Sequence, residues 1–522
     1  MDDMNGFAAN GRRRPAQLPF GAIPRPAMLA FALALVAPFS SLVAQQNAGQ
    51  QPPQQNQQNA PATSAPETES PSTPQQPGAR AQLHTGTSSG LDTDARFENL
   101  LADHQYLRVQ AQLDQLPPEK AQFYRGILAN RSNQLEQSVQ LLDPLVEKVS
   151  ASGDTAREKL LRITLAEDYL RLGDWAKAAQ AYQTLDDRLR ANLSSGEQDE
   201  IEMPLKMLPL VRDNPPITID PCDSFRLQVS NDPLGLIDVP VFIDARSHSW
   251  MLDPTAPFNL ISRSIARNIG LEVSQKSATI QTLTGRPIEV HSTVIPRFTI
   301  GGRLTLHNVT AFVFEDADYS FPHSGYQVEG VLGYSALAAM GRITVSDNAI
   351  EVDPAKEIDP KSDQERLTSG ARFYLDGDEI IVAIGRSQHS SAGSNLQEAS
   401  AGSQGDGDES DDRMFAIDAG GQQTYLTSRW FDEHAAQFNG QKMEPFSFPG
   451  LDSGARSAYV AEDVPLAVGA KTVDLHYIPV LTQPLGSLAR DSVYGVIGID
   501  GLDQLSSYTF DYRTMRFSAR GE

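Results

Sequence analysis

The sequence has one cysteine and many fewer basic than acidic residues. With Cys222 alone, no internal disulfide framework can form, and its position beside Pro221 is typical of an isolated thiol rather than a reactive one. The 43 Lys and Arg residues against 66 Asp and Glu give a net charge of −23. A polyanion of this size repels phosphate backbones, so we do not expect a nucleic-acid-binding protein.

Sequence patterns for metals and cofactors are also missing. The nine histidines show no metal-ligand spacing such as His-x-x-x-His with a companion Glu. Neither a Gly-x-Ser-x-Gly motif nor a phosphate-binding loop is present. We therefore expect no metal site and no cofactor.

Long apolar runs are scarce, and one of them follows a basic N-terminus. Arginines at positions 12–14 precede an apolar run at 27–37, and small residues lead to Ala44. This order predicts a secretory signal peptide over residues 1–44, with an uncleaved anchor or a misassigned start as the alternative. The run is too short for a comfortable permanent span. We expect an exported protein, periplasmic or secreted, with attachment to the cell envelope as a further option.

Two segments have too few apolar residues to build a core. Residues 45–92 are rich in Gln, Pro, Ser, Thr and Ala, and residues 387–412 combine Ser and Gly with six acidic residues and no Lys or Arg. Neither composition offsets the entropy lost on ordering, so both are predicted to be disordered. The first would be a linker or a tether to the envelope, and the second a surface loop.

Residues 93–214 change to a helical period of apolar residues. Around Ala166, Tyr169 and Gly173 the order of small and aromatic residues resembles a tetratricopeptide repeat, with a weaker copy at Gly126. Such repeats line a groove, so a protein partner bound by these helices is one expectation. The other is a helical spacer docked on the next domain, because fewer than three repeats rarely stand alone.

One stretch of the remaining sequence occurs twice. Asp253 ends an apolar run and is followed by small residues, and Asp418 does the same 165 residues later. Gly330-Val331-Leu332-Gly333 recurs at the same offset as Gly495-Val496-Ile497-Gly498. Several landmarks at one offset indicate a duplicated unit.

Each unit is expected to be built mainly of β-strands. Residues 239–253 alternate as in a hairpin, which places the repeated Asp at the end of a strand. We assign the first unit to residues 215–355 and the second to residues 377–522. Residues 356–376 are polar and are predicted to link the two units, which should face each other.

The repeated pattern resembles the aspartic peptidases. Two apolar residues and Asp, then small residues, then a distant Gly-apolar-apolar-Gly, are similar to the motif pair of that family, and to its bacterial retropepsin-like branch above all. The resemblance covers about residues 220–522 and none of the helical part. It implies a multidomain chain: a helical, tetratricopeptide-like segment followed by a mostly β domain with two lobes in one chain, as in pepsin-like enzymes.

The resemblance implies that Asp253 and Asp418 form a catalytic pair. Two carboxylates about 4 Å apart repel by about 4 kcal/mol at an effective dielectric near 20, so one keeps a proton while the other ionises. The ionised member would deprotonate a water, and the protonated member would hydrogen-bond the carbonyl of the scissile bond. The expected function is an exported aspartic endopeptidase acting on peptide or protein substrates.

The resemblance also assigns supporting positions near the two Asp residues. They lie in the loops after each Asp and in the strands beneath the loops: Thr255, Ala256, Gly420, Gly421, Gly330, Gly333, Gly495 and Gly498. The glycines are expected to allow close backbone packing. Turns at residues 284–287 and 449–454 are candidates for a mobile flap or are ordinary turns.

Both motifs depart from the family directly after the Asp. That position usually carries a Thr or Ser whose hydroxyl ties the two loops together, whereas this chain has Pro254 and Ala419. Thr255 is a candidate for a displaced hydroxyl. The alternative hypothesis is therefore a catalytically inactive aspartic-peptidase fold that acts with the helical repeats as a peptide- or protein-binding module of the envelope.

Overall fold

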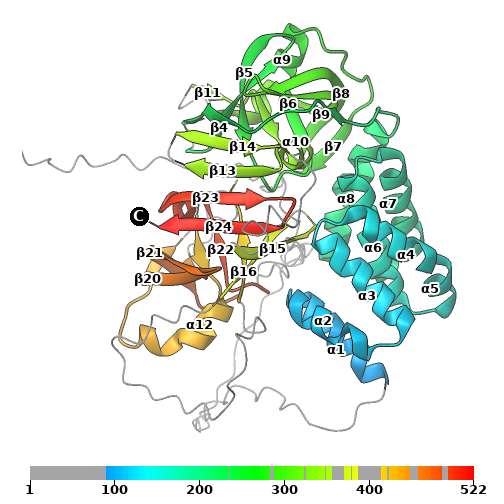
Figure 1. Ribbon diagram of the computed structural model, residues 1–522, viewed down its shortest axis with the longest axis vertical. Helices are drawn as coiled ribbons and strands as arrows, with labels where there is room; N and C mark the ends of the chain where they lie inside the picture. The colour runs from blue at the N-terminus through cyan, green and yellow to red at the C-terminus, as the bar shows by residue number, and fades with distance from the viewer. Residues whose placement is uncertain are drawn as a thin grey trace, which may run out of the picture.

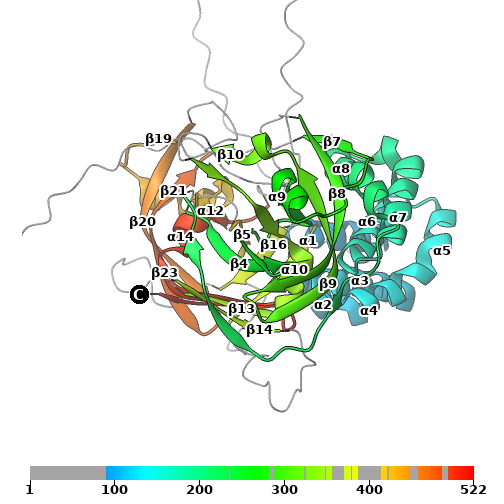
Figure 2. The ribbon, with the colours of Figure 1, turned by 90° about the horizontal axis from the view of Figure 1, so that it is seen from above.

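The computed structural model describes most of the chain from the first helix onward: residues 90–233, 235–281, 287–321, 325–346, 348–354, 370–377, 379–385, 413–419, 423–446, 456–484 and 492–521. A helical part runs alongside two β-rich lobes (Figures 1 and 2). Outside the described residues lie the predicted signal peptide, residues 45–89 of the predicted linker, the acidic loop at 387–412 and nearly all of the candidate flap turns.

The helical part contains α1 to α8, linked by short turns. Their bounds are α1 Gly90–Ala102, α2 Tyr106–Gln112, α3 Pro118–Arg131, α4 Leu135–Leu142, α5 Val146–Ser152, α6 Thr155–Arg171, α7 Trp175–Leu189 and α8 Ser195–Val211. Within the described residues, none of the helices is both long and apolar enough to cross a membrane.

Helix starts in this part follow from local sequence. The Asp154 and Asp174 carboxylates accept hydrogen bonds from backbone N–H groups of the first turns of α6 and α7. Ser194 and Glu197 form a capping box at the start of α8. Helix α3 packs closely on α4, because a Cβ atom added at Gly126 would lie 2.4 Å from the Leu142 side chain.

The first lobe is built on a nine-stranded sheet. The strand order is β1-β9-β6-β12-β5-β4-β8-β7, with β3 paired to β4. The bounds are β1 Thr218–Ile219, β3 Ser230–Asn231, β4 Ile237–Ile243, β5 Arg246–Leu252, β6 Asn259–Ser262, β7 Ala278–Gln281, β8 Pro287–Ile300, β9 Leu304–Phe314 and β12 Gly330–Leu332. Two short helices complete it, α9 Arg263–Asn268 and α10 Tyr334–Met340.

The second lobe repeats this plan in a sheet of thirteen strands. The order is β19-β20-β21-β18-β22-β17-β16-β15-β24-β23-β13-β14-β2. Its own elements are β15 Ala371–Asp376, β16 Glu379–Ile384, β17 Arg413–Ile417, β18 Tyr425–Leu426, α12 Ser428–His434, β19 Glu444–Phe446, β20 Arg456–Val468, β21 Lys471–Leu481, β22 Gly495–Ile497, α14 Ile499–Leu502, β23 Leu505–Asp511 and β24 Arg516–Gly521.

The last six strands of this sheet come from both lobes, three from each. β13 (Arg342–Ser346), β14 (Ala349–Asp353) and β2 (Phe225–Gln228) come from the first lobe and join β23, β24 and β15 of the second. In the antiparallel pair β13–β23, Thr344 faces Thr509, its own equivalent 165 residues later, and the two hydroxyl oxygens are 2.9 Å apart. A residue that pairs with its equivalent lies on a two-fold axis, so the lobes are related by pseudo-two-fold symmetry.

Residues 356–376 were predicted to form a linker, and the structure differs at the end of this segment. Ala371–Asp376 form strand β15, which pairs with both β16 and β24. The polar residues before it concealed the short alternation of buried Ala371, Phe373 and Leu375. The second lobe therefore begins earlier than residue 377.

The sheet of the second lobe is buried on both faces. Every residue of β16 is buried. Ile380 and Val382 face the core that this lobe shares with the first, while Ile381 and Ala383 face a second core formed with α1 to α3. Cover on both sides explains why this strand is a continuous apolar run instead of an alternating one.

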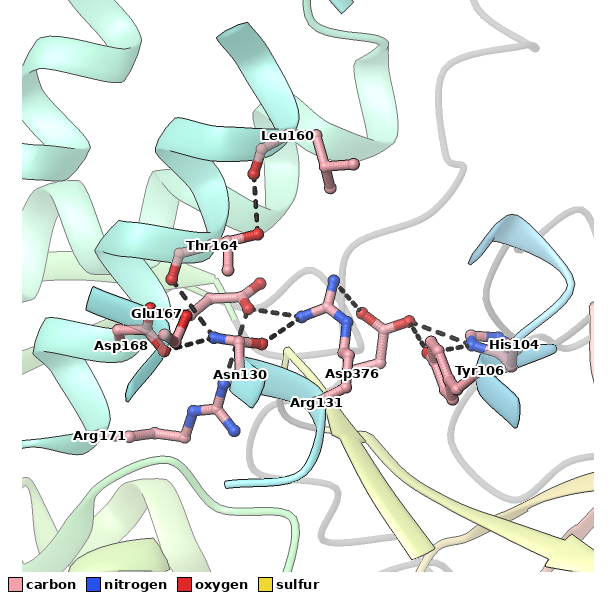
Figure 3. Close-up of polar contacts among 11 residues, drawn as sticks. His104, Tyr106, Asn130, Arg131, Leu160, Thr164, Glu167, Asp168, Arg171 and Asp376 are labelled. Carbon is pink, nitrogen blue, oxygen red and sulfur yellow. Dashed lines mark hydrogen bonds and ion pairs between the residues drawn. The ribbon is translucent and has the colours of Figure 1, made fainter. Parts of the chain in front are cut away.

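A buried polar network joins the helical part to the β15–β16 turn (Figure 3). Arg131, at the end of α3, donates to Glu167 at 2.7 Å and forms an ion pair with Asp376 at 2.8 Å. The Tyr106 hydroxyl donates to Asp376 at 2.8 Å, and His104 lies 3.1 Å from it. Burial opposes ionisation of Asp376, but the Arg131 charge and the contacts with His104 and Tyr106 outweigh it and hold its pKa well below the usual range.

We expect Arg131→Met to lower the free energy of unfolding by about 1–3 kcal/mol, because it leaves two partly buried carboxylates, Glu167 and Asp376, without their buried cation. Equilibrium urea unfolding measures this loss. Arg226→Met is the matched control: its ion pair with Glu351 is solvent-exposed on both sides and should contribute about 1 kcal/mol or less.

The ion pair between Arg131 and Asp376 also makes the stability of the fold depend on pH. Because the pKa of Asp376 is lowered on folding, its stabilisation is present above about pH 4 and is lost as the pH falls further. Equal losses of stability for Arg131→Met and Arg226→Met would contradict a structural role for the network.

Candidate active site

Asp253 stands directly after strand β5, at the edge of the first lobe that faces the second. β5 pairs in parallel with β12, with Leu252 opposite Leu332. The backbone N–H of Asp253 extends this ladder by donating to the Leu332 carbonyl at 3.3 Å. The side chain is 1 % exposed.

Asp418 occupies the equivalent position after β17. That strand pairs in parallel with β22, with Ile417 opposite Ile497, and the N–H of Asp418 donates to the Ile497 carbonyl at 2.9 Å. Both carbonyl partners end the Gly-apolar-apolar strands that recur at the 165-residue offset. The same backbone geometry therefore presents one carboxylate from each lobe.

The predicted supporting glycines lie where backbone segments approach closely. A Cβ atom added at Gly333 would lie 2.3 Å from the Phe258 carbonyl oxygen, and one at Gly498 would lie 2.7 Å from the backbone of Gln423. Gly330 would meet the Trp250 ring at 2.4 Å, and Gly495 would meet neighbours at 2.9 Å. At Gly333 and Gly498 a side chain would displace the Asp loops, and at Gly330 and Gly495 it would displace residues of the neighbouring strands.

Of the other predicted supporting residues, Thr255 and Ala256 lie in the loop that carries Asp253. The Thr255 hydroxyl donates to Asp253 Oδ1 at 2.8 Å and its N–H donates to the same oxygen at 3.0 Å. The Ala256 carbonyl accepts from the Tyr334 N–H at 2.8 Å and so ties the loop to α10. Gly420 and Gly421 lie outside the described residues.

The loops after the two Asp residues meet at a small cavity on the pseudo-two-fold axis. Pro254 and Ala419, the residues that follow each Asp, both line it. So do the equivalent residues Ile343 and Tyr508. The two loops thus meet through apolar side chains at the point where the family resemblance would place hydroxyl groups.

Burial and a neighbouring charge both act on the Asp253 carboxyl. Burial, above all, and the nearby charge of Asp418 raise the pKa of Asp253 to about 6. The hydrogen bonds from Thr255 and the N–H of Ala256 act in the opposite direction, because they stabilise the ionised form. Around pH 6 Asp253 therefore changes between a proton donor and a carboxylate.

Two polar residues of the site were not predicted from the sequence. Asn259 accepts the Gly333 N–H through Oδ1 at 3.0 Å, and Thr424 accepts the Gly498 N–H through its hydroxyl at 2.9 Å. Asn259 and Thr424 are equivalents at the 165-residue offset. The sequence did contain a signal for them: a polar residue stands at the same position of both repeats, next to buried apolar residues.

No cluster of three or more His, Cys, Asp or Glu side chains in the described part of the chain is arranged to hold a metal ion. The groups that the structure shows at this place are the Asp253 carboxyl, the Thr255 hydroxyl that donates to it, and the backbone bonds of both Asp residues. A carboxyl with such neighbours can donate, accept and hold a proton.

Comparison with known proteins finds a family model that is similar to part of the chain. A family model described as aspartyl protease matches residues 239–336, which include Asp253 but neither Asp418 nor the helical part. The likeness of the helices to tetratricopeptide repeats thus stays a prediction. No curated protein sequence matches the chain.

Solved structures similar to this one are of low sequence identity. A retropepsin-like aspartic protease from Rickettsia conorii is 12 % identical, with 27 % of this chain and 98 % of that chain covered and a TM-score of 0.18. Basic 7S globulin from soybean is 11 % identical, with 57 % of this chain and 95 % of that chain covered and a TM-score of 0.34.

We expect Thr255→Val to raise the pKa of Asp253 above about 6, because it removes a hydroxyl that hydrogen-bonds the ionised carboxylate. The pKa is read from the pH titration of the ¹³C carboxyl signal of labelled Asp. Thr255→Ser keeps the donor and should leave the value near that of the parent. A titration unchanged by the Val substitution would show that the hydroxyl does not tune this carboxylate.

Proposed function

We propose that this protein is an aspartic-type endopeptidase that hydrolyses peptide bonds through a water activated by Asp253 and Asp418. The observation that carries the proposal is the symmetric placement of the two residues. Each Asp follows a strand, donates its N–H to the carbonyl that ends a Gly-apolar-apolar strand, and borders the pseudo-two-fold axis. The aspartyl protease match around Asp253 supports the same assignment.

The roles within the pair follow from their surroundings. Asp253, with its pKa raised to about 6, holds the proton in mildly acidic solution and hydrogen-bonds the oxygen of the scissile carbonyl. Asp418 then accepts a proton from the water that attacks the carbonyl carbon. A proton passes to the amide nitrogen as the C–N bond breaks, and an acid and an amine are released. Thr255 fixes the orientation of the Asp253 carboxyl during these transfers.

The expected substrates are peptides or unfolded proteins outside the cytoplasm. The basic, apolar and small residues of the first 44 positions support export to the periplasm or the medium. The acidic net charge of −23 disfavours acidic polymers as substrates.

A second candidate is a binding module that has lost catalysis. It is favoured by the apolar residues Pro254 and Ala419, which stand where the family resemblance places hydroxyl groups and which line one cavity at the axis. In this function the lobes and the helical part would hold a peptide or protein without cutting it.

We expect Asp253→Asn and Asp418→Asn each to lower the rate of peptide cleavage by roughly 10²–10⁴-fold, because either amide removes one proton-transfer group at nearly constant volume. The assay follows cleavage of an unstructured protein by the chain without residues 1–44, between pH 3 and pH 8. The rate of the parent should fall as the pH rises through about 6, where Asp253 loses its proton.

Asp220→Asn is the matched control, since Asp220 is solvent-exposed and paired with His307 away from the site. It should leave the rate unchanged. Cleavage that survives Asp418→Asn would rule out the proposed pair. Peptide binding without cleavage at any pH would establish the binding module instead.

A further inference from the structure

An apolar pocket lies beside the loop that carries Asp253. Ala256, Pro257 and Phe258 of this loop form one wall of the pocket. Met207 of helix α8 closes the pocket from the helical part. The remaining walls come from the strands and loops of the first lobe: Leu260, Ile280, Ile288, Val290, Phe314 and Tyr319.

Met207 determines how deep this pocket is. Its side chain is 1 % exposed, and the free volume left in the pocket is only about 10 Å³, near the room needed by a single water. The helix that carries it is fixed on the lobe, because the Ser292 hydroxyl donates to the Leu210 carbonyl at 3.0 Å. Just after the helix, Asn214 donates to the Thr310 hydroxyl at 3.1 Å.

Two further contacts of the helical part reach the Asp253 motif. The Trp175 ring of α7 lies 6.4 Å, centroid to centroid, from the ring of Phe258. The hydroxyl of Tyr334, the residue after Gly333, donates to Asn133 between α3 and α4 at 2.7 Å. The helical part therefore contacts the loop after Asp253 through Trp175 and the first residue of α10 through Asn133.

We propose that helix α8 forms a wall of the side-chain pocket beside Asp253, and that Met207 sets the size of the apolar side chain that the site accepts. This inference rests on the proposed function. Because Ala256 and Pro257 belong to the same loop as Asp253, a peptide bound with its scissile bond at Asp253 would place a neighbouring side chain at this pocket. The walls are apolar, so the favoured occupant is a small aliphatic side chain, and a charged one would lose its hydration without a partner.

The test compares peptides that differ only in the residues flanking the scissile bond: Ala, Val, Leu or Phe. Met207→Ala deepens the pocket and should raise the ratio of kcat/KM for Phe over Ala peptides at least about 10-fold, the scale of discrimination by a few methylene groups. Met207→Leu, of nearly equal volume, should change the ratio less than about 3-fold.

Met203→Ala is the matched control, because Met203 lies one turn earlier on α8, is partly buried in the same core and does not line the pocket. It should leave the ratio unchanged. Thermal unfolding is measured for every variant; should Met207→Ala fail to fold, Met207→Val carries the same comparison with a smaller expected shift. An unchanged ratio in a folded Met207 variant overturns the inference.

A binding measurement separates this inference from the proposed function. The same peptides, labelled with a fluorophore, are titrated against Asp253→Asn with and without Met207→Ala, and anisotropy gives the order of affinities. An order shifted toward Phe supports the pocket even if the parent cleaves nothing. An order unchanged by Met207→Ala, or no peptide binding at all, rejects it.

Discussion

The antiparallel pairing of β13 with β23 is the contact on which the arrangement of the two lobes depends. Thr344 faces Thr509 in this ladder, and each lobe adds two more strands on its own side. In each lobe the strand under the Asp loop, β12 or β22, precedes the ladder by one short helix. The ladder therefore fixes the position of both Asp loops relative to the axis and, through them, the approach of the two carboxylates.

Much of this arrangement is encoded in local patterns that recur at one offset. The hairpin that ends at Asp253 and the glycines at 330 and 333 could be predicted, because a strand period and a required absence of side chains are visible in the sequence. Strand β15 could not, because its pairing partners β16 and β24 and its cover by α1 to α3 decide its state. The contact of Arg131 with Asp376 joins residues that no local pattern relates, and so it too was missed.

The axis between the lobes shows how the chain holds its Asp loops without the hydroxyls expected there. Each loop is anchored within its own lobe by a backbone hydrogen bond, to Leu332 or to Ile497. The Thr255 hydroxyl donates to the Asp253 carboxylate of its own loop. Pro254 and Ala419 bring apolar surface from the two loops to one cavity, and apolar contact lacks the directionality of a hydrogen bond.

The turn of β15–β16 that reaches into the helical part has a consequence for how the protein can change over time. Asp376 finds its charge partner in α3, and the face of the second lobe that carries Ile381 is covered by α1 to α3. Loss of the helices would leave the Asp376 carboxylate without its Arg131 partner and would expose an apolar face of the sheet to water. A sequence change that removes or weakens the helical part would therefore also destabilise the second lobe, so the two parts are constrained to change together.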